Sequence, residues 1–294
     1  MHDLKDLYLI DLFCGCGGFS TGAVQAGAKV LLAVDCWEEA LAVHELNHPE
    51  TTHLNTKLGG DVEEFASGLI GLIESLPSGS RVHLHGSPPC QNLAANNALR
   101  DTTEGQVLVD WYLALMDIMI PYVASYTMEQ VANPLLYHHI EKYGGRVVAM
   151  KEYGIPQSRR RLFLTNLDLG LIDEFKAPAP TFQQVIDSIG FEMEAPMDAL
   201  TIGSNRKTNI PGQSKYHYYG LNRISPTVTG QFPKAYSIES GRMRELPIRV
   251  FSALQTFPPN YDFGSYSIKT TRQLIGNSVP PNMAKIIMTI AVST

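Results

Sequence analysis

The sequence predicts an α/β protein whose main domain is a doubly wound, Rossmann-like sheet, accompanied by a second, smaller, loop-rich domain. Two observations carry this prediction. The chain opens with a strand pattern, a glycine-rich turn, a helical pattern and a second strand pattern, which together form the βαβ unit of a parallel sheet. Strand and helix patterns then alternate to about residue 178, as a doubly wound sheet requires. With 294 residues, 44% of them apolar, the chain is long enough for such a core and a smaller lobe.

The elements follow in order along the chain. The first strand is expected at residues 8–13, the turn at 14–18, a helix from there to Gly27, and the second strand at 29–34. Further strands are expected at residues 81–85, around 126–128, at 146–150 and at 161–165, with the clearest helix at 106–122. Parallel strands end at the same edge of a sheet, so the segments after them should meet there.

The composition changes after about residue 178. Pro, Gly, Ser and Asn become frequent there, and long segments with helical or strand periodicity become rare. A last helix is expected at residues 281–292, with Pro at its start. These observations predict one domain of residues 1–178 plus 266–294 and a small domain of residues 179–265.

Composition excludes several classes of protein. The four cysteines form neither a CxxC pair nor a cluster with histidine at zinc spacing, so we expect no metal and no disulfide framework. No apolar run reaches the roughly 18 residues of a membrane span, and no secretory signal pattern is seen at the start. We therefore expect a cytoplasmic protein that does not bind a membrane, and a monomer.

The charge distribution points to a nucleic acid. The net charge is −6, which alone argues against a phosphate-rich partner. From residue 199 to 238, however, no Asp or Glu occurs. Cations and flat rings alternate there and suit phosphate contact and base stacking: Arg206, Lys207, Lys215, Tyr216, His217, Tyr218, Tyr219, Arg223 and Lys234. A solvated basic face is the alternative interpretation.

The glycine-rich turn at residues 14–18 is a candidate site for a nucleotide-like ligand, because it follows a strand and opens a helix. Asp35 ends the second predicted strand, where a carboxylate can accept hydrogen bonds from ribose hydroxyls. Asp61, in a Gly-Asp-Val segment, stands at another expected strand end. The alternative interpretation is an ordinary tight turn at residues 14–18, with Asp35 and Asp61 as acidic side chains exposed to solvent.

Cys90 is the candidate nucleophile, since it lies just beyond the strand at residues 81–85 in a stiff Ser-Pro-Pro-Cys-Gln segment. A thiolate there can attack an electron-poor ring carbon. Glu129 ends the next strand, so its carboxyl group should lie on the same edge and could bond to a pyrimidine. A lone buried cysteine and a surface acid are the alternatives.

Six segments occur in order along the chain, from about residue 8 to 292. They are Phe13-x-Gly15-x-Gly17, Pro89-Cys90-Gln91, Glu129-x-Val131, Gln157-x-Arg159-x-Arg161, Arg244-Glu245-Leu246 leading into Leu254-Gln255-Thr256-Phe257-Pro258, and Gly276-Asn277-Ser278-Val279-Pro280. Read together, these segments resemble the S-adenosylmethionine-dependent cytosine-5 DNA methyltransferase family of bacterial and phage type.

The resemblance implies transfer of a methyl group to carbon 5 of a flipped-out cytosine in double-stranded DNA, with S-adenosylhomocysteine as the second product. Cys90 would add to carbon 6, Glu129 would engage ring nitrogen 3 and the amino group, Arg161 would hold oxygen 2, and Arg159 would complete the catalytic set. The methyl donor would be bound by Phe13, Cys14, Gly15, Gly17, Gly18, Phe19, Asp35, Cys36, Trp37, Asp61, Val62, Pro88, Asn277 and Ser278. DNA would be contacted by Gln91, Asn92, Arg206, Lys207, Lys215, Tyr216, Arg223 and Thr227. The small domain would then be the target-recognition domain.

Two departures leave alternatives open. Gln130 stands where the family usually has Asn, which puts the local packing in doubt. The segment between Arg161 and Leu246 is short for target recognition, so specific contacts would fall mainly within residues 202–222. Methylation of tRNA is one alternative, because a related branch shares the Ser-Pro-Pro-Cys-Gln segment. A non-catalytic DNA-binding relative is the other.

Overall fold

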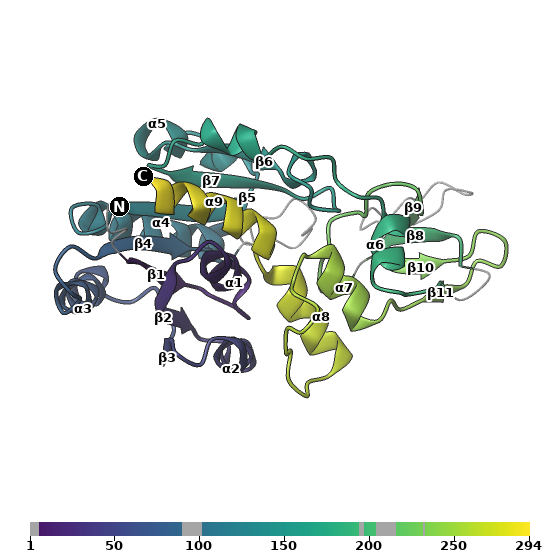
Figure 1. Ribbon diagram of the computed structural model, residues 1–294, viewed down its shortest axis with the longest axis horizontal. Helices are drawn as coiled ribbons and strands as arrows, with labels where there is room; N and C mark the ends of the chain where they lie inside the picture. The colour runs from purple at the N-terminus through teal and green to yellow at the C-terminus, as the bar shows by residue number, and fades with distance from the viewer. Residues whose placement is uncertain (1–5, 90–101, 194–196, 204–215, 232) are drawn as a thin grey trace.

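The computed structural model describes residues 6–89, 102–193, 197–203, 216–231 and 233–294. Among these residues, seven strands form one mixed sheet and four strands form a second, smaller sheet (Figure 1). The large sheet has the order β3-β2-β1-β4-β5-β7-β6. Its strands are β1 (Leu7–Leu12), β2 (Lys29–Asp35), β3 (Thr52–Asn55), β4 (Arg81–Gly86), β5 (Ser125–Val131), β6 (Arg146–Ala149) and β7 (Arg160–Thr165).

The strand order confirms the doubly wound α/β prediction, with one difference at β7. Strands β1 to β5 pair in parallel, whereas β7 runs antiparallel to both β5 and β6. Only residues 150–159 connect β6 to β7, and a parallel pairing needs a crossover of a dozen or more residues. The edge strand β3 was not predicted, because its four residues carry no apolar run.

Helices cover both faces of the large sheet. One face packs on α3 (Val62–Glu74), α4 (Thr102–Met119) and α5 (His139–Tyr143), and the other on α1 (Gly18–Gln25) and α9 (Pro281–Ser293). Figure 1 shows α9 running beside α1, far from it in sequence. The two helices approach closely at Gly22, where an added Cβ would lie 2.3 Å from the Pro281 carbonyl oxygen. The carboxyl-terminal helix α9 therefore packs on the same face of the large sheet as α1.

The small sheet has the order β11-β10-β8-β9 and is antiparallel. It consists of β8 (Ala199–Gly203), β9 (Tyr216–Gly220), β10 (Lys234–Tyr236) and β11 (Met243–Arg244). One face packs on α6 (Phe182–Ser188), α7 (Ile248–Leu254) and α8 (Ile268–Asn277). The hydrophobic cluster beneath the small sheet also contains Ala40 and Val43 of α2 (Glu38–Asn47). It therefore joins the small lobe, formed by the small sheet and its helices, to the large lobe, formed by the large sheet and its helices.

The carboxyl ends of β1, β4 and β5 meet at one edge of the large sheet. Leu12 pairs with Gly86, and Gly86 pairs with Met128. The residues that follow these three strands are therefore neighbours at one edge, as the prediction of a shared site requires. In the part of the chain that is described, no helix is long and apolar enough to span a bilayer. The same part holds no group of three or more His, Cys, Asp or Glu side chains that could bind a metal ion.

Candidate active site

The glycine-rich turn after β1 has one open side and one packed side. Phe13, Gly15 and Gly17 all have positive φ angles, of 56°, 54° and 86°. An added Cβ at Gly15 would meet no atom within 4 Å, whereas one at Gly17 would lie 2.7 Å from the Tyr261 hydroxyl oxygen. The turn thus offers free space on the Gly15 side, where a ligand can approach the backbone.

Asp35, at the end of β2, clamps this turn. Its Oδ2 accepts a hydrogen bond from the Gly15 N–H at 2.8 Å, and its Oδ1 accepts one from the Trp37 N–H at 2.8 Å. Burial raises the pKa of the Asp35 carboxyl, and the backbone hydrogen bonds oppose that rise. Because each carboxylate oxygen can accept more than one hydrogen bond, both remain able to take a ribose hydroxyl. The open turn and this acceptor fit the adenosyl part of a methyl donor.

The other residues expected at the donor site fall into three groups. Phe13 is half-buried, its ring meeting Trp111 edge-on at 6.3 Å between centroids. Trp37 is also half-buried, and Cys36 and Asn277 are exposed. Cys14, Gly18 and Pro88 are buried, and Val62 is half-buried against the core.

Two of the residues expected to bind the methyl donor, Phe19 and Asp61, make contacts within the protein fold itself. Asp61 does not follow a strand as expected. It is the N-cap residue of α3, and its Oδ1 accepts hydrogen bonds from the backbone N–H groups of Glu63 and Glu64. The Phe19 ring lies in the core, 2% exposed and stacked on His85 at 3.4 Å between centroids. Only the Phe19 backbone is therefore left for a ligand at the turn.

Ser278 lies behind the turn and links it to the end of α8. Its Oγ is 3.1 Å from Cys16 Sγ, and it also donates to the Leu274 carbonyl oxygen at 2.8 Å. Burial raises the pKa of the Cys16 thiol to about 12, so that this thiol stays protonated. The Ser278 side chain therefore holds the turn in place from its buried side.

Glu129 and Arg161 form a nearly buried ion pair at the edge where β5 ends and β7 begins. Arg161 Nε lies 2.8 Å from Glu129 Oε1, and the two side chains are 12% and 8% exposed. The Nε–H is not directed at this oxygen, so the contact is an ion pair without a good hydrogen bond. A second nitrogen, Nη1, donates to the Arg160 carbonyl oxygen at 2.9 Å. The structure thus brings two of the predicted catalytic side chains together.

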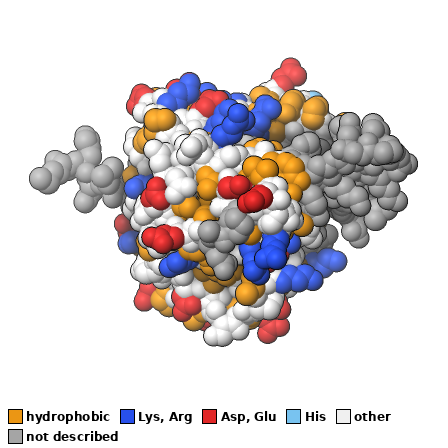
Figure 2. Space-filling model, turned by 90° about the vertical axis from the view of Figure 1, so that its right-hand side faces the viewer, with side chains coloured by type: hydrophobic (Ala, Val, Ile, Leu, Met, Phe, Trp, Pro, Cys, Tyr) orange, Lys and Arg blue, Asp and Glu red, His pale blue; other side chains and the backbone are white. Residues whose placement is uncertain are grey.

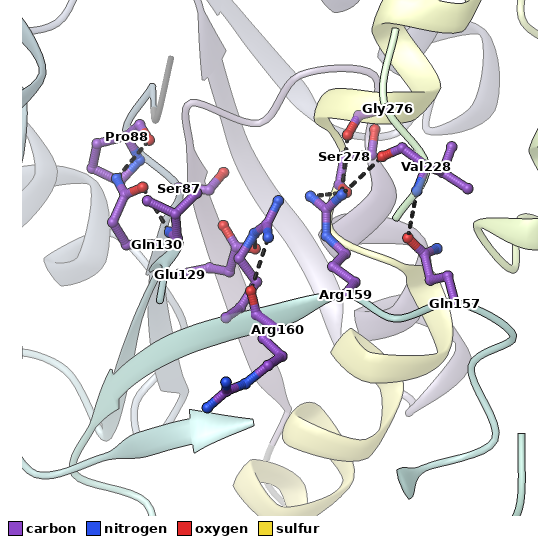
Figure 3. Close-up of polar contacts among 12 residues, drawn as sticks. Ser87, Pro88, Glu129, Gln130, Gln157, Arg159, Arg160, Val228, Gly276 and Ser278 are labelled. Atoms are coloured by element: carbon purple, nitrogen blue, oxygen red, sulfur yellow. Dashed lines mark hydrogen bonds and ion pairs between the residues drawn. The ribbon is translucent and has the colours of Figure 1, made fainter. Parts of the chain in front are cut away.

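Gln130 connects this pair to the loop that leads toward Cys90. Its Nε2 donates to the Pro88 carbonyl oxygen at 3.1 Å, and its Oε1 accepts from the Val131 N–H at 2.8 Å (Figure 3). Gln130 is fully buried. Gln130 is one methylene longer than the asparagine usual at this position, and its side-chain amide still hydrogen-bonds to the loop at Pro88. Cys90 itself lies outside the described residues.

Replacing Gln130 with alanine is expected to lower kcat and to destabilise the fold by about 1–3 kcal/mol, because the buried Pro88 carbonyl would lose its partner. Thermal unfolding and steady-state methyl transfer measure the two effects. Gln183→Ala, which removes a partly exposed amide bonded to Asp187 within α6, is the control. A variant with unchanged kcat would show that the Gln130–Pro88 hydrogen bond does not position the loop.

Arg159 is almost fully buried and donates hydrogen bonds to backbone carbonyl groups. It is 2% exposed and donates to the carbonyl oxygens of Val228 (3.4 Å), Gly276 (3.2 Å) and Ser278 (3.1 Å) (Figure 3). Its neighbour Gln157 accepts from the Val228 N–H at 3.0 Å. Arg159 and Gln157 therefore join the large sheet to the small lobe and to the end of α8.

The residues expected to contact DNA are only partly described. Arg223 is exposed and Thr227 is half-buried, just before Val228. The backbone of Tyr216 begins β9. Gln91, Asn92, Arg206, Lys207 and Lys215 lie outside the described residues.

Sequence reasoning missed a group of side chains that supports the packed side of the turn. A Cβ added at Gly17 would meet the rings of His44 and His48. The Tyr261 hydroxyl donates to the Cys16 carbonyl oxygen. The spacing of His44 and His48, four residues apart at the carboxyl end of α2, was the available signal. It is uninformative by itself, because a buried helix face carries the same spacing.

Comparison with known proteins fits this geometry. The family model for C-5 cytosine-specific DNA methylase matches residues 7–112 and 187–291. The type II methyltransferase M.HindV of Haemophilus influenzae is 26% identical over 302 residues, covering 95% of this chain and 94% of the relative. M.NgoPII of Neisseria gonorrhoeae is 25% identical, covering 94% and 92%.

Solved structures share the fold. A prophage-encoded DNA modification methyltransferase of E. coli aligns with a TM-score of 0.67 at 20% identity, covering 98% of this chain and 99% of that one. The S. pombe Dnmt2 methyltransferase aligns with a TM-score of 0.62 at 15% identity, covering 98% of both chains. The family match spans well over half of the sequence and includes the turn after β1 and the end of α8. The chain therefore belongs to the C-5 cytosine-specific DNA methylase family and is a DNA cytosine-5 methyltransferase.

Proposed function

We propose that this protein transfers the methyl group of S-adenosylmethionine to carbon 5 of a flipped-out cytosine in double-stranded DNA, with Cys90 as the covalent nucleophile. The observation that carries the assignment of roles is the Glu129–Arg161 pair, which lies beside the loop that Gln130 anchors two residues before Cys90. A carboxyl group and a guanidinium group at one edge match the nitrogen and oxygen positions of cytosine.

The chemistry needs a nucleophile because carbon 5 of cytosine is unreactive while the ring is conjugated. The Cys90 thiolate adds to carbon 6, forming a sulfur–carbon bond and placing the electron pair on carbon 5. Carbon 5 then takes the methyl group, and S-adenosylhomocysteine is left. Water removes the carbon 5 proton, and the electron pair of that carbon–hydrogen bond forms the carbon 5–carbon 6 double bond as the Cys90 thiolate leaves. Flipping the base out of the stack costs a few kcal/mol, which contacts in the pocket must recover.

Glu129 and Arg161 act on the ring that accepts the thiolate. The carboxyl group of Glu129 donates its O–H to ring nitrogen 3 and accepts a hydrogen bond from the amino group, which draws electrons from carbon 6 as addition proceeds. Arg161 holds oxygen 2 through guanidinium N–H groups other than the one that donates to the Arg160 carbonyl oxygen. We assign Arg159 a positioning role rather than contact with the base, because backbone carbonyl groups occupy its guanidinium.

S-Adenosylmethionine supplies an electrophilic methyl group on sulfonium. The residues that would hold it are those around the open side of the turn: Phe13, Gly15, Asp35, Cys36 and Trp37. Phe13 and Trp37 offer ring faces, and Asp35 offers hydrogen-bond acceptors without leaving the turn.

DNA is expected to bind along the small lobe and the edge that bears Glu129. The face of the molecule in Figure 2 shows groups of Lys and Arg side chains beside hydrophobic ones, with some Asp and Glu side chains between them. Such a mixed surface suits phosphate contact with moderate salt dependence. The type II relatives suggest a role in restriction-modification, and we expect a cytoplasmic monomer.

Trapping with a modified substrate tests this function. Duplex DNA that carries 5-fluorocytosine at the target site should form a covalent adduct with the protein when S-adenosylmethionine is present, because fluorine cannot leave as a proton does. A library of duplexes covers the unknown target sequence, and tRNA serves as the competing substrate. Absence of an adduct with every duplex would overturn the proposal, and an adduct with tRNA alone would move it to RNA.

A further inference from the structure

Three histidines cluster beneath the glycine-rich turn and have no part in the proposed chemistry. His44 lies on α2, His48 caps the carboxyl end of α2, and His53 lies on β3. The His44 and His48 ring centroids are 4.7 Å apart, and those of His44 and His53 are 4.9 Å apart. His44 is fully buried, whereas His53 is half-buried at the surface.

The cluster touches the turn from its packed side. An added Cβ at Gly17 would lie 3.0 Å from Cδ2 of His44 and 3.2 Å from Cδ2 of His48. Thr21 donates to the Gly17 carbonyl oxygen at 2.7 Å, and its Oγ1 lies 3.1 Å from His48 Nε2. The backbone that faces a ligand on the Gly15 side is thus supported by imidazole rings on the Gly17 side.

A continuous chain of hydrogen bonds runs from the surface to a buried carboxyl group. His53 Nε2 lies 2.8 Å from His44 Nδ1, and His44 Nε2 lies 3.0 Å from Ser20 Oγ. The Ser20 hydroxyl donates to Asp11 Oδ2 at 2.6 Å. Since the Ser20 proton is directed at Asp11, its oxygen accepts from the His44 Nε2–H. His44 Nδ1 must then accept from the His53 Nε2–H.

Burial and the neighbouring ionisable groups favour the neutral form of the His44 ring. Burial lowers the pKa of His44 well below its usual value, and the neighbouring His48 and His53 lower it further. The pKa of His48 is lowered to about 4 and that of Asp11 is raised to about 7, in both cases chiefly by burial. Glu45 acts only on His53, and Asp35 acts on Asp11. A neutral His44 that carries its proton on Nε2 therefore makes both hydrogen bonds, as donor to Ser20 and as acceptor from His53.

We propose that His44, held in one tautomer by His53, is a positioning residue for the methyl donor. It fixes the start of α1 through Ser20 and supports the turn at Gly17, so that the backbone at Gly15 is preorganised before the donor arrives. This inference rests on the proposed function, because it takes the turn as the donor site. A buried histidine that serves stability alone is the competing explanation.

The two explanations differ in what a substitution changes. Loss of preorganisation weakens donor binding and raises the donor KM, while kcat at saturating donor is retained. A role in stability alone lowers the melting temperature and leaves donor affinity unchanged well below that temperature. The half-buried His53 provides the milder variant, since its removal leaves His44 in the fold.

The experiment compares donor affinity by calorimetry, donor KM and kcat by methyl transfer, and melting temperature for four variants. His53→Ala and His44→Leu are expected to raise the donor Kd about 5- to 10-fold, the effect of one buried hydrogen bond. His44→Gln keeps an N–H near the Nε2 position and should restore most of the affinity. His138→Ala, an exposed histidine next to α5, is the control and should leave all values unchanged.

The outcomes separate this inference from the proposed function. Wild-type protein that fails to bind S-adenosylmethionine would overturn the proposed donor site. Wild-type binding together with unchanged donor affinity in His53→Ala, or a loss in kcat without a change in donor KM, would overturn the positioning role alone. If His44→Leu fails to fold, His53→Ala and His44→Gln still decide the question.

Discussion

Replacing Cys90 with serine should abolish methyl transfer to duplex DNA while leaving the affinity for S-adenosylmethionine unchanged. A hydroxyl group has a far higher pKa than a thiol and is the poorer nucleophile, so carbon 6 would not be attacked and carbon 5 would stay unreactive. Transfer of a radiolabelled methyl group, together with calorimetry for the donor, measures both quantities. Cys90 lies outside the glycine-rich turn in the sequence, so its replacement should remove methyl transfer without changing the affinity for S-adenosylmethionine.

The same variant gives a second readout with 5-fluorocytosine DNA. The wild type should form the adduct, and Cys90→Ser should not. Methyl transfer that persists in Cys90→Ser would contradict a covalent mechanism through this residue. Loss of donor binding in the variant would indicate that the substitution disturbs the fold.

Replacing Glu129 with glutamine should lower kcat about 10²- to 10⁴-fold, the range observed when a group that handles a proton in the transition state is removed. The amide can still contact Arg161, but it carries no negative charge and no transferable proton. Steady-state methyl transfer with saturating DNA and donor measures the effect. Glu152→Gln, which changes an exposed carboxyl group, is the control and should retain activity.

Stability must be followed in the same experiment, because Glu129 and Arg161 form a nearly buried pair. Removing one partner of a buried ion pair outright costs about 3–5 kcal/mol, so Glu129→Ala would confuse loss of the fold with loss of chemistry. Glutamine keeps the size and polarity of the side chain. A Glu129→Gln variant with wild-type kcat would exclude this carboxyl from the reaction.

The sequence alone predicted the features that depend on local patterns. Apolar periodicity located six of the seven strands of the large sheet, and the glycine-rich turn after the first strand was correctly placed. The parallel order of β1, β4 and β5 follows from the βαβ pattern, which is why Glu129 was expected at the edge where the Cys90 loop begins. The six ordered segments likewise identified the family.

Only the tertiary structure decided how individual polar side chains are used. Arg159 and Arg161 occur in one segment, yet one holds the carbonyl of Gly276, 117 residues away, and the other pairs with Glu129. Likewise, Asp61 accepts two backbone hydrogen bonds at the start of α3, a contact that the sequence pattern did not predict.

The physical reason is that periodicity reports which side of an element is buried, whereas a hydrogen bond depends on which atom lies opposite. His44, His53 and Ser20 carry no pattern that joins them, and they meet because β3, α2 and α1 pack around the same turn. The sequence by itself thus determined the fold class and the family. The packing of distant elements determined which side chains face the substrate edge and which ones hold that edge in place.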